Sequence, residues 1–312
     1  MQVPLIATIA TWLAMSIRMS IPLLYPSLGG LLSQKAGVYN FGLEGMMLCG
    51  AFFGYWGSYK TGNPWMGLLM AVACGALLGL LLAFTSIYLR VSQLVIGLGI
   101  GIFSLGLTGY LFRLFSTTST GDVAPAAPLF PKVNFGFLKE IPYIGEILFT
   151  HDWMVYFALA LVLVIAWFFY RTTPGLNFRA VGENPQVADT AGVNVILYRY
   201  LAVVISGALA GMGGAYLTVT QTAYFTENLS AGRGWIAISA IILGKFNPWG
   251  VLLACLLFGA ADSGQMQIQF MNLGIPYQFL LMIPYIMAII AMTGVVGKVR
   301  SPAAMGKPYI KN

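Results

Sequence analysis

The sequence predicts an all-α protein, a polytopic bundle of transmembrane helices that forms a single domain over residues 1–312. Hydrophobic residues make up 59% of the chain and charged residues only 8%, whereas about a quarter of the residues in a soluble domain are charged. The mean hydropathy is +0.82. The apolar residues also gather in runs of about 20, the length that a helix needs to cross a bilayer core of about 30 Å.

These runs give about nine crossings. In chain order they lie at residues 4–32, 41–59, 64–89, 93–115, 153–170, 200–221, 234–244, 250–263 and 276–297. We expect Pro22 and Pro26 to kink or split the first run, because proline removes a helical hydrogen bond. The break GKFNPWG separates the two short runs. Those runs could instead form a re-entrant hairpin, which would change the count.

The distribution of Lys and Arg predicts the orientation. If residues 171–199 are cytoplasmic, ten basic residues lie inside, five lie outside, and Arg18 lies within the first run. Because cytoplasmic loops are enriched in Lys and Arg, we predict that the N-terminus is outside and the C-terminus inside. The inside set is Lys35, Arg90, Arg171, Arg179, Arg199, Lys245, Lys298, Arg300, Lys307 and Lys311, and the outside set is Lys60, Arg113, Lys132, Lys139 and Arg233.

The net charge of +7 does not indicate a nucleic-acid partner. The 16 basic residues are spread along an apolar chain and form no compact basic surface of the kind that binds a phosphate backbone. Their positions fit membrane topology instead. We therefore expect lipid, and no nucleic acid, around this chain.

The longest polar connection, residues 116–152, is extracytoplasmic in this topology. It contains four acidic residues, and its apolar residues alternate with charges. Part of it is predicted to lie as an amphipathic segment at the outer interface. It could receive a soluble partner, or it could simply connect two spans.

The second polar connection, residues 171–199, carries the signals of a short helix. Asn184 can cap the helix with its side-chain oxygen, Pro185 suits the first helical position, and Gly192 suits a left-handed exit. The predicted helix, residues 185–191, has about two turns and is marginal in water by itself. We therefore expect it to pack against the rest of its own chain or against a second protein. It could be a simple connector between spans, or it could dock on a second protein.

A family resemblance favours docking. The stretch AVGENPQVADTAGVNVILYRYLAVVISGALAGMGGAYL, residues 180–217, resembles the cytoplasmic loop and following helix of ABC-importer permeases, in the branch that includes ribose-type and branched-chain amino-acid permeases. Residues 28–52 contain NFGLEG, and residues 231–250 read AGRGWIAISAIILGKFNPWG. Both stretches are more similar to nucleoside-type permeases than to ribose-type ones.

The resemblance implies a permease subunit in the bacterial plasma membrane. Its expected partners are ABC ATPase subunits, a second and often non-identical permease, and an extracytoplasmic solute-binding protein. The solute would be nucleoside-like or sugar-like, with riboflavin as an alternative. ATP and Mg would bind to the partner ATPase, and no cofactor is expected in this chain. The residues expected to couple it to the ATPase are Gly182, Glu183, Asn184, Pro185, Ala188 and Asp189.

The sequence does not predict an enzyme. No phosphate-binding loop of the form G-x-x-x-x-G-K-[ST] is present, and the single histidine, His151, leaves no credible metal site. The main rival is a stand-alone carrier driven by protons or sodium. Such carriers usually keep carboxylates at mid-membrane, and this chain has almost none there.

Five polar residues are candidates for a gate or a solute path: Asn40, Glu44, Gln221, Gln265 and Gln269. Glu44 could accept backbone N–H groups at a helix start, or it could form part of an inner gate. The three glutamines could line the outer mouth, where amides suit a neutral polar solute. They could equally be hydrated ends of spans.

Several glycines are spaced four residues apart and predict close helix contacts. This packing could occur within the chain or across a dimer. The pairs are Gly75 and Gly79, Gly97 and Gly101, and Gly207 and Gly211.

Overall fold

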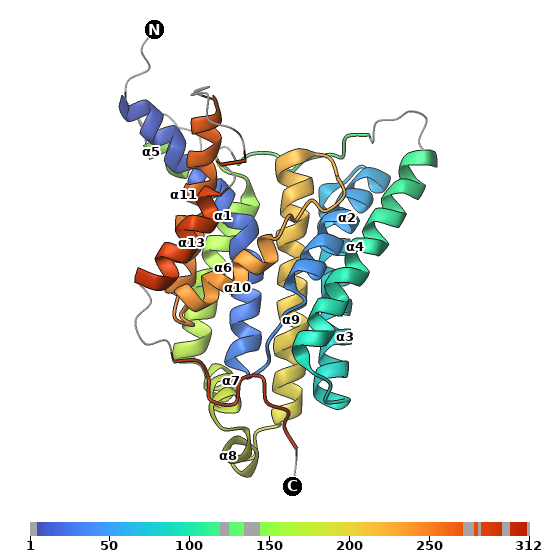
Figure 1. Ribbon diagram of the computed structural model, residues 1–312, viewed down its shortest axis with the longest axis vertical. Coiled ribbons are helices and arrows are strands. Elements are labelled where there is room, and N and C mark those ends of the chain that lie inside the picture. The colour runs from blue at the N-terminus through green and yellow to red at the C-terminus, as the bar shows by residue number, and fades with distance from the viewer. Residues whose placement is uncertain are drawn as a thin grey trace.

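The computed structural model describes residues 5–118, 125–133, 144–270, 278–279, 282–294 and 300–310. Most of the long helices run roughly along the long axis of the molecule (Figure 1). Within the described part of the chain there is no β-strand, and the one β-bridge joins Lys132 to Asp152. The predicted all-α class is therefore confirmed.

The long helices are α1 (Leu5–Lys35), α2 (Leu43–Thr61), α3 (Pro64–Ala83), α4 (Gln93–Thr118), α6 (Trp153–Arg171), α9 (Val195–Tyr216) and α11 (Pro248–Phe270). The shorter helices are α5 (Ile144–Leu148), α7 (Thr173–Glu183), α8 (Pro185–Thr190), α10 (Arg233–Leu243) and α13 (Ile283–Gly294). Two π-helical turns, η1 (Phe84–Tyr88) and η3 (Leu217–Thr222), extend α3 and α9.

Five of the described helices are long and apolar enough to cross a membrane. They are α3 with η1, α4, α6, α9 with η3, and α11. Helix α10 is a shorter apolar helix of 11 residues. At 1.5 Å per residue it spans only about 16 Å, roughly half of a bilayer core. It therefore cannot cross the membrane by itself.

The prolines of α1 do not split the first predicted span, the stronger of the two expected effects, because one helix continues through both of them. Pro22 has no N–H to donate to the carbonyl oxygen of Arg18, four residues earlier. The side-chain amide of Gln221 donates to that oxygen instead, at 3.3 Å. Gly213 leaves room for Pro26, since a Cβ atom on Gly213 would lie 2.7 Å from the Pro26 ring. Neighbouring helices thus accommodate both prolines.

Helices α3 and α9 pack closely in the centre of the fold through glycines. A Cβ atom on Gly75 would lie 2.2 Å from the carbonyl oxygen of Gly207, and a Cβ atom on Gly207 would lie 2.2 Å from that of Gly75. Gly211 approaches the Ala71 carbonyl in the same way. These spaced glycines therefore pack within the chain. Gly101 differs, because nothing lies within 4 Å of the position that its Cβ would take.

Part of the predicted connection 116–152 crosses one end of the bundle in an extended form. The amides of Ala127 and Phe130 donate to carbonyl groups of Ala223 and Val219, at 2.8 and 2.9 Å. Helix α5 follows as a single short turn before α6. Residues 119–124 and 134–143, which include much of the predicted amphipathic segment, lie outside the described residues.

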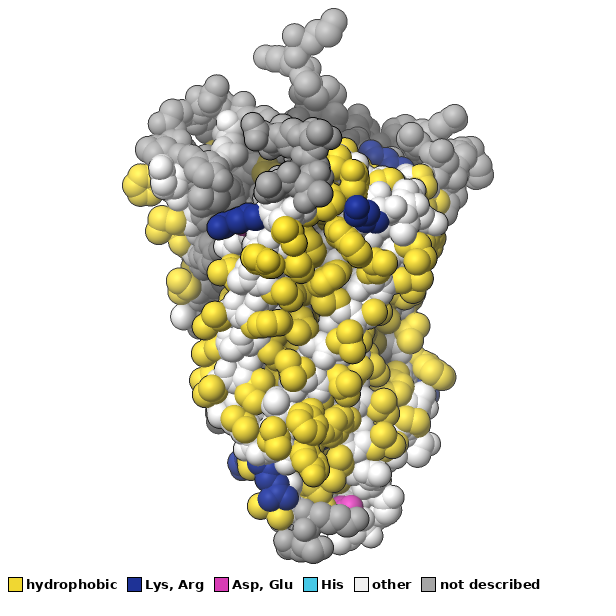
Figure 2. All heavy atoms as spheres, turned by 90° about the vertical axis from the view of Figure 1, so that its right-hand side faces the viewer, with side chains coloured by type: hydrophobic (Ala, Val, Ile, Leu, Met, Phe, Trp, Pro, Cys, Tyr) yellow, Lys and Arg dark blue, Asp and Glu magenta, His cyan; other side chains and the backbone are white. Residues whose placement is uncertain are grey.

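The surface has the charge distribution of a membrane protein. Figure 2 shows hydrophobic side chains covering the middle of one face, with Lys and Arg near its two ends. Large exposed side chains on this part of the bundle include Leu77 of α3 and Ile102 of α4, which are 66% and 75% exposed. The described chain starts at one end of the molecule, and residues 300–310 lie at the other, beside α7 and α8 (Figure 1).

Candidate functional site

Helix α8 forms at the predicted place, at the end of the molecule opposite the start of α1 (Figure 1). Asn184 caps it, since its Oδ1 accepts the Val187 N–H at 3.2 Å, and Pro185 takes the first helical position. Gly192 has φ = +86° in the turn that follows, a conformation that favours glycine. This short helix is folded against the rest of the chain rather than standing free.

The packing of α8 explains how two turns remain helical. Ala188 is 3% exposed and belongs to a small apolar cluster with Val181 and Val195. On the opposite side, Gln186, Val187 and Thr190 are exposed, Val187 to 61%. Helix α8 therefore presents one apolar side to its own chain and leaves the other side available to a partner.

Gly182 lies where α7 meets the end of α1. A Cβ atom on Gly182 would fall 2.1 Å from the Lys35 carbonyl oxygen, so no larger side chain fits without movement. Glu183, the next residue, accepts the Ala303 amide at 3.4 Å through its Oε2. Both predicted coupling residues therefore contact other segments at the same end of the molecule.

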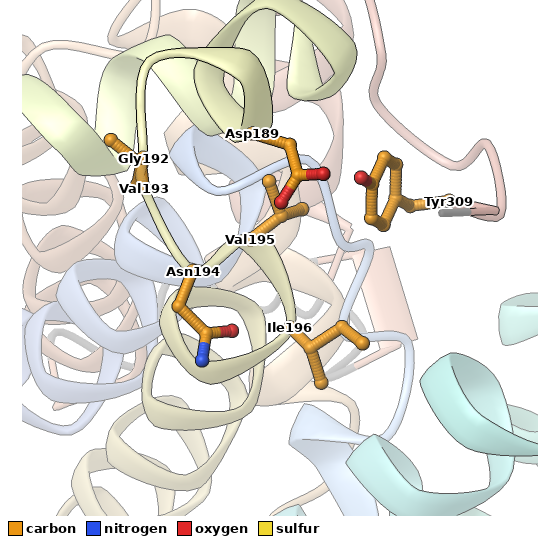
Figure 3. A pocket seen from close by; sticks show the side chains of 7 residues that line it. All are labelled: Asp189, Gly192, Val193, Asn194, Val195, Ile196 and Tyr309. Carbon is orange, nitrogen blue, oxygen red and sulfur yellow. The ribbon is translucent and has the colours of Figure 1, made fainter. Parts of the chain in front are cut away.

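Asp189 faces the C-terminal segment, residues 300–310. Figure 3 shows its carboxylate pointing toward the Tyr309 hydroxyl across a cavity of about 320 Å³. Desolvation raises the pKa of Tyr309, and the hydrogen bond to Asp189 raises it further. The phenol thus stays protonated and donates to the carboxylate. A second cavity of about 480 Å³ lies between the start of α8 and residues 303–310.

Glu44 joins the first turns of two helices. It lies in the first turn of α2, and its carboxylate accepts the backbone amides of Gly232 and Gly234, at 2.9 and 2.6 Å, together with the Ser230 hydroxyl. Gly234 lies in the first turn of α10, which Figure 1 shows at mid-height. A carboxylate is stabilised at such a helix start by its free N–H groups and dipole. Glu44 therefore ties α2 to α10 inside the bundle.

Asn40 is fully buried just before α2. Its Oδ1 accepts the Gly42 amide at 3.0 Å, and its Nδ2 donates to the Ser206 hydroxyl of α9 at 2.9 Å. It therefore fixes the loop that precedes α2 against α9.

The three glutamines occupy different surroundings. Gln221 donates to the Arg18 carbonyl of α1, and Arg18 in turn donates to the Thr220 carbonyl at 3.2 Å. Gln265 is 9% exposed, and the Gln269 amide nitrogen is buried without a hydrogen-bond partner among the described residues. No hydrogen bond within the described part of the chain joins Gln221 to either of them.

Sequence reasoning did not single out the C-terminal segment. Residues 300–310 have no regular secondary structure, so neither helical nor strand periodicity reveals them. Their backbone nevertheless makes hydrogen bonds with Gly182 and Gly37. A buried arginine, Arg199 of α9, donates to the Lys307 carbonyl. The one available signal was Gly306, which adopts φ = +78°.

The family described as branched-chain amino acid transport system / permease component matches residues 12–292. The chain belongs to this family. It is the permease component of an ATP-binding-cassette transporter and a multi-pass protein of the bacterial inner membrane, as the sequence predicts. No solved structure matches it.

Several characterised relatives are similar over most of their length. The guanosine ABC transporter permease protein NupQ of Bacillus subtilis is 39% identical over 93% of both chains. The nucleoside ABC transporter permease protein NupC of Lactococcus lactis is 36% identical over 94% of both chains. A putative glucose ABC transporter permease protein, TsgC13 of Haloferax volcanii, is 37% identical over 81% of this chain and 76% of its own.

Proposed function

We propose that this permease imports a nucleoside-like solute, using ATP hydrolysed by separate cytoplasmic subunits. The observation that carries the proposal is α8, a capped helix whose exposed side lies at one end of the molecule. Two relatives with near full-length similarity are named for guanosine and for nucleosides. The nucleotide-binding subunits would seat α8 in a cleft, and their closure on ATP would move it.

A sugar is the second candidate for the solute, because the glucose permease TsgC13 is also similar over most of this chain. Both kinds of solute are neutral and rich in hydroxyl groups, which suits a permease that need only bind its cargo weakly. An external binding protein would select the solute and deliver it to the outer mouth.

The proposed assembly contains a second, non-identical permease. Bacillus subtilis has another guanosine ABC transporter permease protein, NupP, which is 26% identical to this chain over 93% of this chain and 84% of its own. NupQ and NupP thus share one named solute in one organism. We expect this chain to be the counterpart of NupQ and to form a heterodimer with a permease similar to NupP.

We propose that the chain crosses the membrane about nine times, with the N-terminus outside and the C-terminus inside. The short helix α10 would complete one of these crossings only together with the segment that precedes it, residues 223–232. In that orientation α7, α8 and residues 300–310 face the cytoplasm, together with Arg171, Arg179 and Lys307. An excess of Lys and Arg on that side is the usual pattern of cytoplasmic segments.

The decisive experiment reconstitutes the permease pair with its ATPase and binding protein in liposomes. Uptake of labelled guanosine, glucose and riboflavin is measured with ATP enclosed and with ATP absent. We expect ATP-dependent uptake of guanosine. Uphill transport by this chain alone on a proton or sodium gradient would refute the proposal.

A double variant tests the coupling residues. We expect Glu183→Ala with Asp189→Ala to separate ATP hydrolysis from uptake while the permease remains inserted. Normal uptake and normal hydrolysis in this variant would remove the case for docking through α8.

A further inference from the structure

The C-terminal segment connects three parts of the molecule that are distant in sequence. The Ala304 amide donates to the Gly182 carbonyl at 3.0 Å, at the end of α7. The Gly306 amide donates to the Gly37 carbonyl at 3.0 Å, in the turn after α1. Tyr309 reaches Asp189 of α8. Residues 304–309 therefore join the docking helix to the turn that follows the first span.

The turn after α1 leads directly to the junction of α2 and α10. Gly37 ends α1 with φ = +85°, and the Tyr39 amide donates to the Gln93 side chain at 2.8 Å. Asn40 then binds α9. Four residues further on, Glu44 binds the start of α10. If Gly37 moves, the short stretch of chain from Gly37 to Glu44 can therefore carry that movement to the middle of the bundle.

Arg199 of α9 helps to hold the segment in place. Its side chain is 2% exposed, and its Nη1 donates to the Lys307 carbonyl at 3.0 Å. Its Nη2 lies 3.1 Å from the position that a Cβ atom on Gly37 would take. Its Nε and Nη2 have no hydrogen-bond partner among the described residues. Because a buried cation is costly without compensation, this bond to Lys307 adds to the backbone hydrogen bonds of Ala304 and Gly306 in fixing where the segment lies.

We propose that residues 300–310 are part of the coupling apparatus. They form one docking surface with α8 for the ATPase subunit, and they transmit the motion of α8 to Gly37 and the start of α2. Arg199 is the positioning residue for this link. The inference rests on the proposed docking of α8 and extends it to a segment without regular structure.

The main test is Arg199→Met in the complete importer, reconstituted with guanosine as the solute. Methionine retains an unbranched chain of similar reach, and replacing a buried charge with an apolar side chain is often neutral for stability. We expect the complex to assemble and hydrolyse ATP, while guanosine uptake per ATP falls about ten-fold, as when a typical coupling between sites is lost. Arg199→Lys, which can still donate to the Lys307 carbonyl, should restore part of the loss.

The matched control is Arg171→Met. Arg171 is an exposed cation in the last turn of α6, at the same end of the molecule. It should leave uptake per ATP unchanged. If Arg199→Met also leaves that ratio within about two-fold, the link has no part in coupling.

A glycine pair provides a second test. Gly37→Ala strains a residue at φ = +85° and places a Cβ atom 3.4 Å from the Ala304 carbonyl oxygen as well as near Arg199. Gly62→Ala imposes a similar strain at φ = +68°, where nothing lies within 4 Å. We expect Gly37→Ala alone to lower uptake per ATP. Equal effects of the two variants would overturn the proposal.

A measurement on the unaltered complex does not depend on any variant folding. Hydrogen exchange of a peptide covering residues 302–308 should show protection both without nucleotide and with ATP bound, because the segment moves together with Gly182 and Gly37. Loss of protection when ATP binds would show that the link breaks, and would refute transmission through it. An importer that takes up none of the labelled guanosine, glucose and riboflavin with ATP would refute the proposed function instead.

Discussion

Glu44 acts on backbone donors that lie far away in the sequence. Its position in the first turn of α2 could be predicted, as could its ability to bind the free N–H groups of a helix start. The sequence could not show that most of the donors belong to α10 and its approach, some 190 residues later. No local pattern encodes that pairing. It depends on two loops meeting inside the bundle.

We expect Glu44→Gln to weaken the fold. The substitution replaces one carboxylate oxygen of Glu44 with an NH₂ group. That group would face an N–H or O–H group that now donates a hydrogen bond to Glu44. The loss should be about 1–3 kcal/mol in the free energy of unfolding, the usual penalty for unmatched buried polar groups. Thermal unfolding of the detergent-solubilised protein measures it.

Glu227→Gln is the control for Glu44→Gln. Glu227 pairs with Arg113 at 2.8 Å, but both side chains are exposed, so solvent screens the pair. Its loss should leave the melting temperature unchanged. A normal melting temperature for Glu44→Gln would show that no charge is needed at the start of α2.

His151 makes the stability of the folded protein depend on pH. This effect can be assigned to one residue, because the chain has no other histidine. Burial lowers the pKa of His151 below its ordinary value of 6.5, and the nearby Arg18 and Lys132 lower it further, against the opposing effects of a hydrogen bond to the Ile147 carbonyl and of Asp152. The unfolded chain therefore binds a proton at a higher pH than the folded chain does. Stability is lost as the pH falls through about 6.5.

His151→Gln should flatten this dependence. The Gln amide can still donate to the Ile147 carbonyl, which Nε2 of His151 contacts at 2.8 Å. We expect the melting temperature of the variant to change less than that of the unaltered protein between about pH 7.5 and 5.5. Identical pH profiles would show that folding does not change the pKa of His151.

At the scale of single helices, most boundaries could be predicted because runs of about 20 apolar residues are unmistakable. The cap of α8 was also predicted correctly, from Asn184, Pro185 and Gly192. Two features were not. Of the two effects expected of Pro22 and Pro26, the split of α1 does not occur, and Gln221 binds the carbonyl group that Pro22 leaves free. The π-helical turns η1 and η3 have no sequence signature.

Glycine-to-alanine variants on two helices, α9 and α4, test which glycines make close helix contacts. Gly207→Ala places a Cβ atom 2.2 Å from the Gly75 carbonyl oxygen, and overpacking of this kind costs about 1–3 kcal/mol. Gly106 of α4 has nothing within 4 Å. There, Ala should stabilise the helix by about 0.5–1 kcal/mol, because glycine is the more flexible residue.

Unfolding of the two variants in detergent should therefore shift in opposite directions. A stabilising effect of Gly207→Ala would mean that α3 and α9 are not in close contact. A destabilising effect of Gly106→Ala would mean that another element packs against this side of α4.

At the scale of the whole molecule, composition was sufficient to predict a membrane-embedded helical bundle. It was not sufficient to show how the end of the molecule that carries α7 and α8 is built. Predicted coupling residues such as Gly182 and Asp189 lie beside residues 300–310, an irregular segment whose position only the folded chain reveals. Tertiary hydrogen bonds to carbonyl groups leave no trace in a sequence, since every residue has such a group.

Orientation is a property of the whole molecule and can be tested with two cysteines. Lys60 near the end of α2 and Thr190 of α8 are both exposed, whereas the native Cys49 and Cys255 are buried. The third native cysteine, Cys74, is half-buried and is replaced with Ala in both variants. A membrane-impermeant maleimide should label Lys60→Cys in intact cells, and Thr190→Cys only after permeabilisation. The reverse pattern would invert the proposed topology.

The position of residues 300–310 has a practical consequence for handling the protein. The described chain stops at Ile310, next to the cavity at the start of α8, so an affinity tag joined there without a spacer would crowd the same face. A tag placed ahead of Leu5 would sit at the far end (Figure 1). Pull-down experiments that test for the proposed ATPase subunits should therefore use an N-terminal tag.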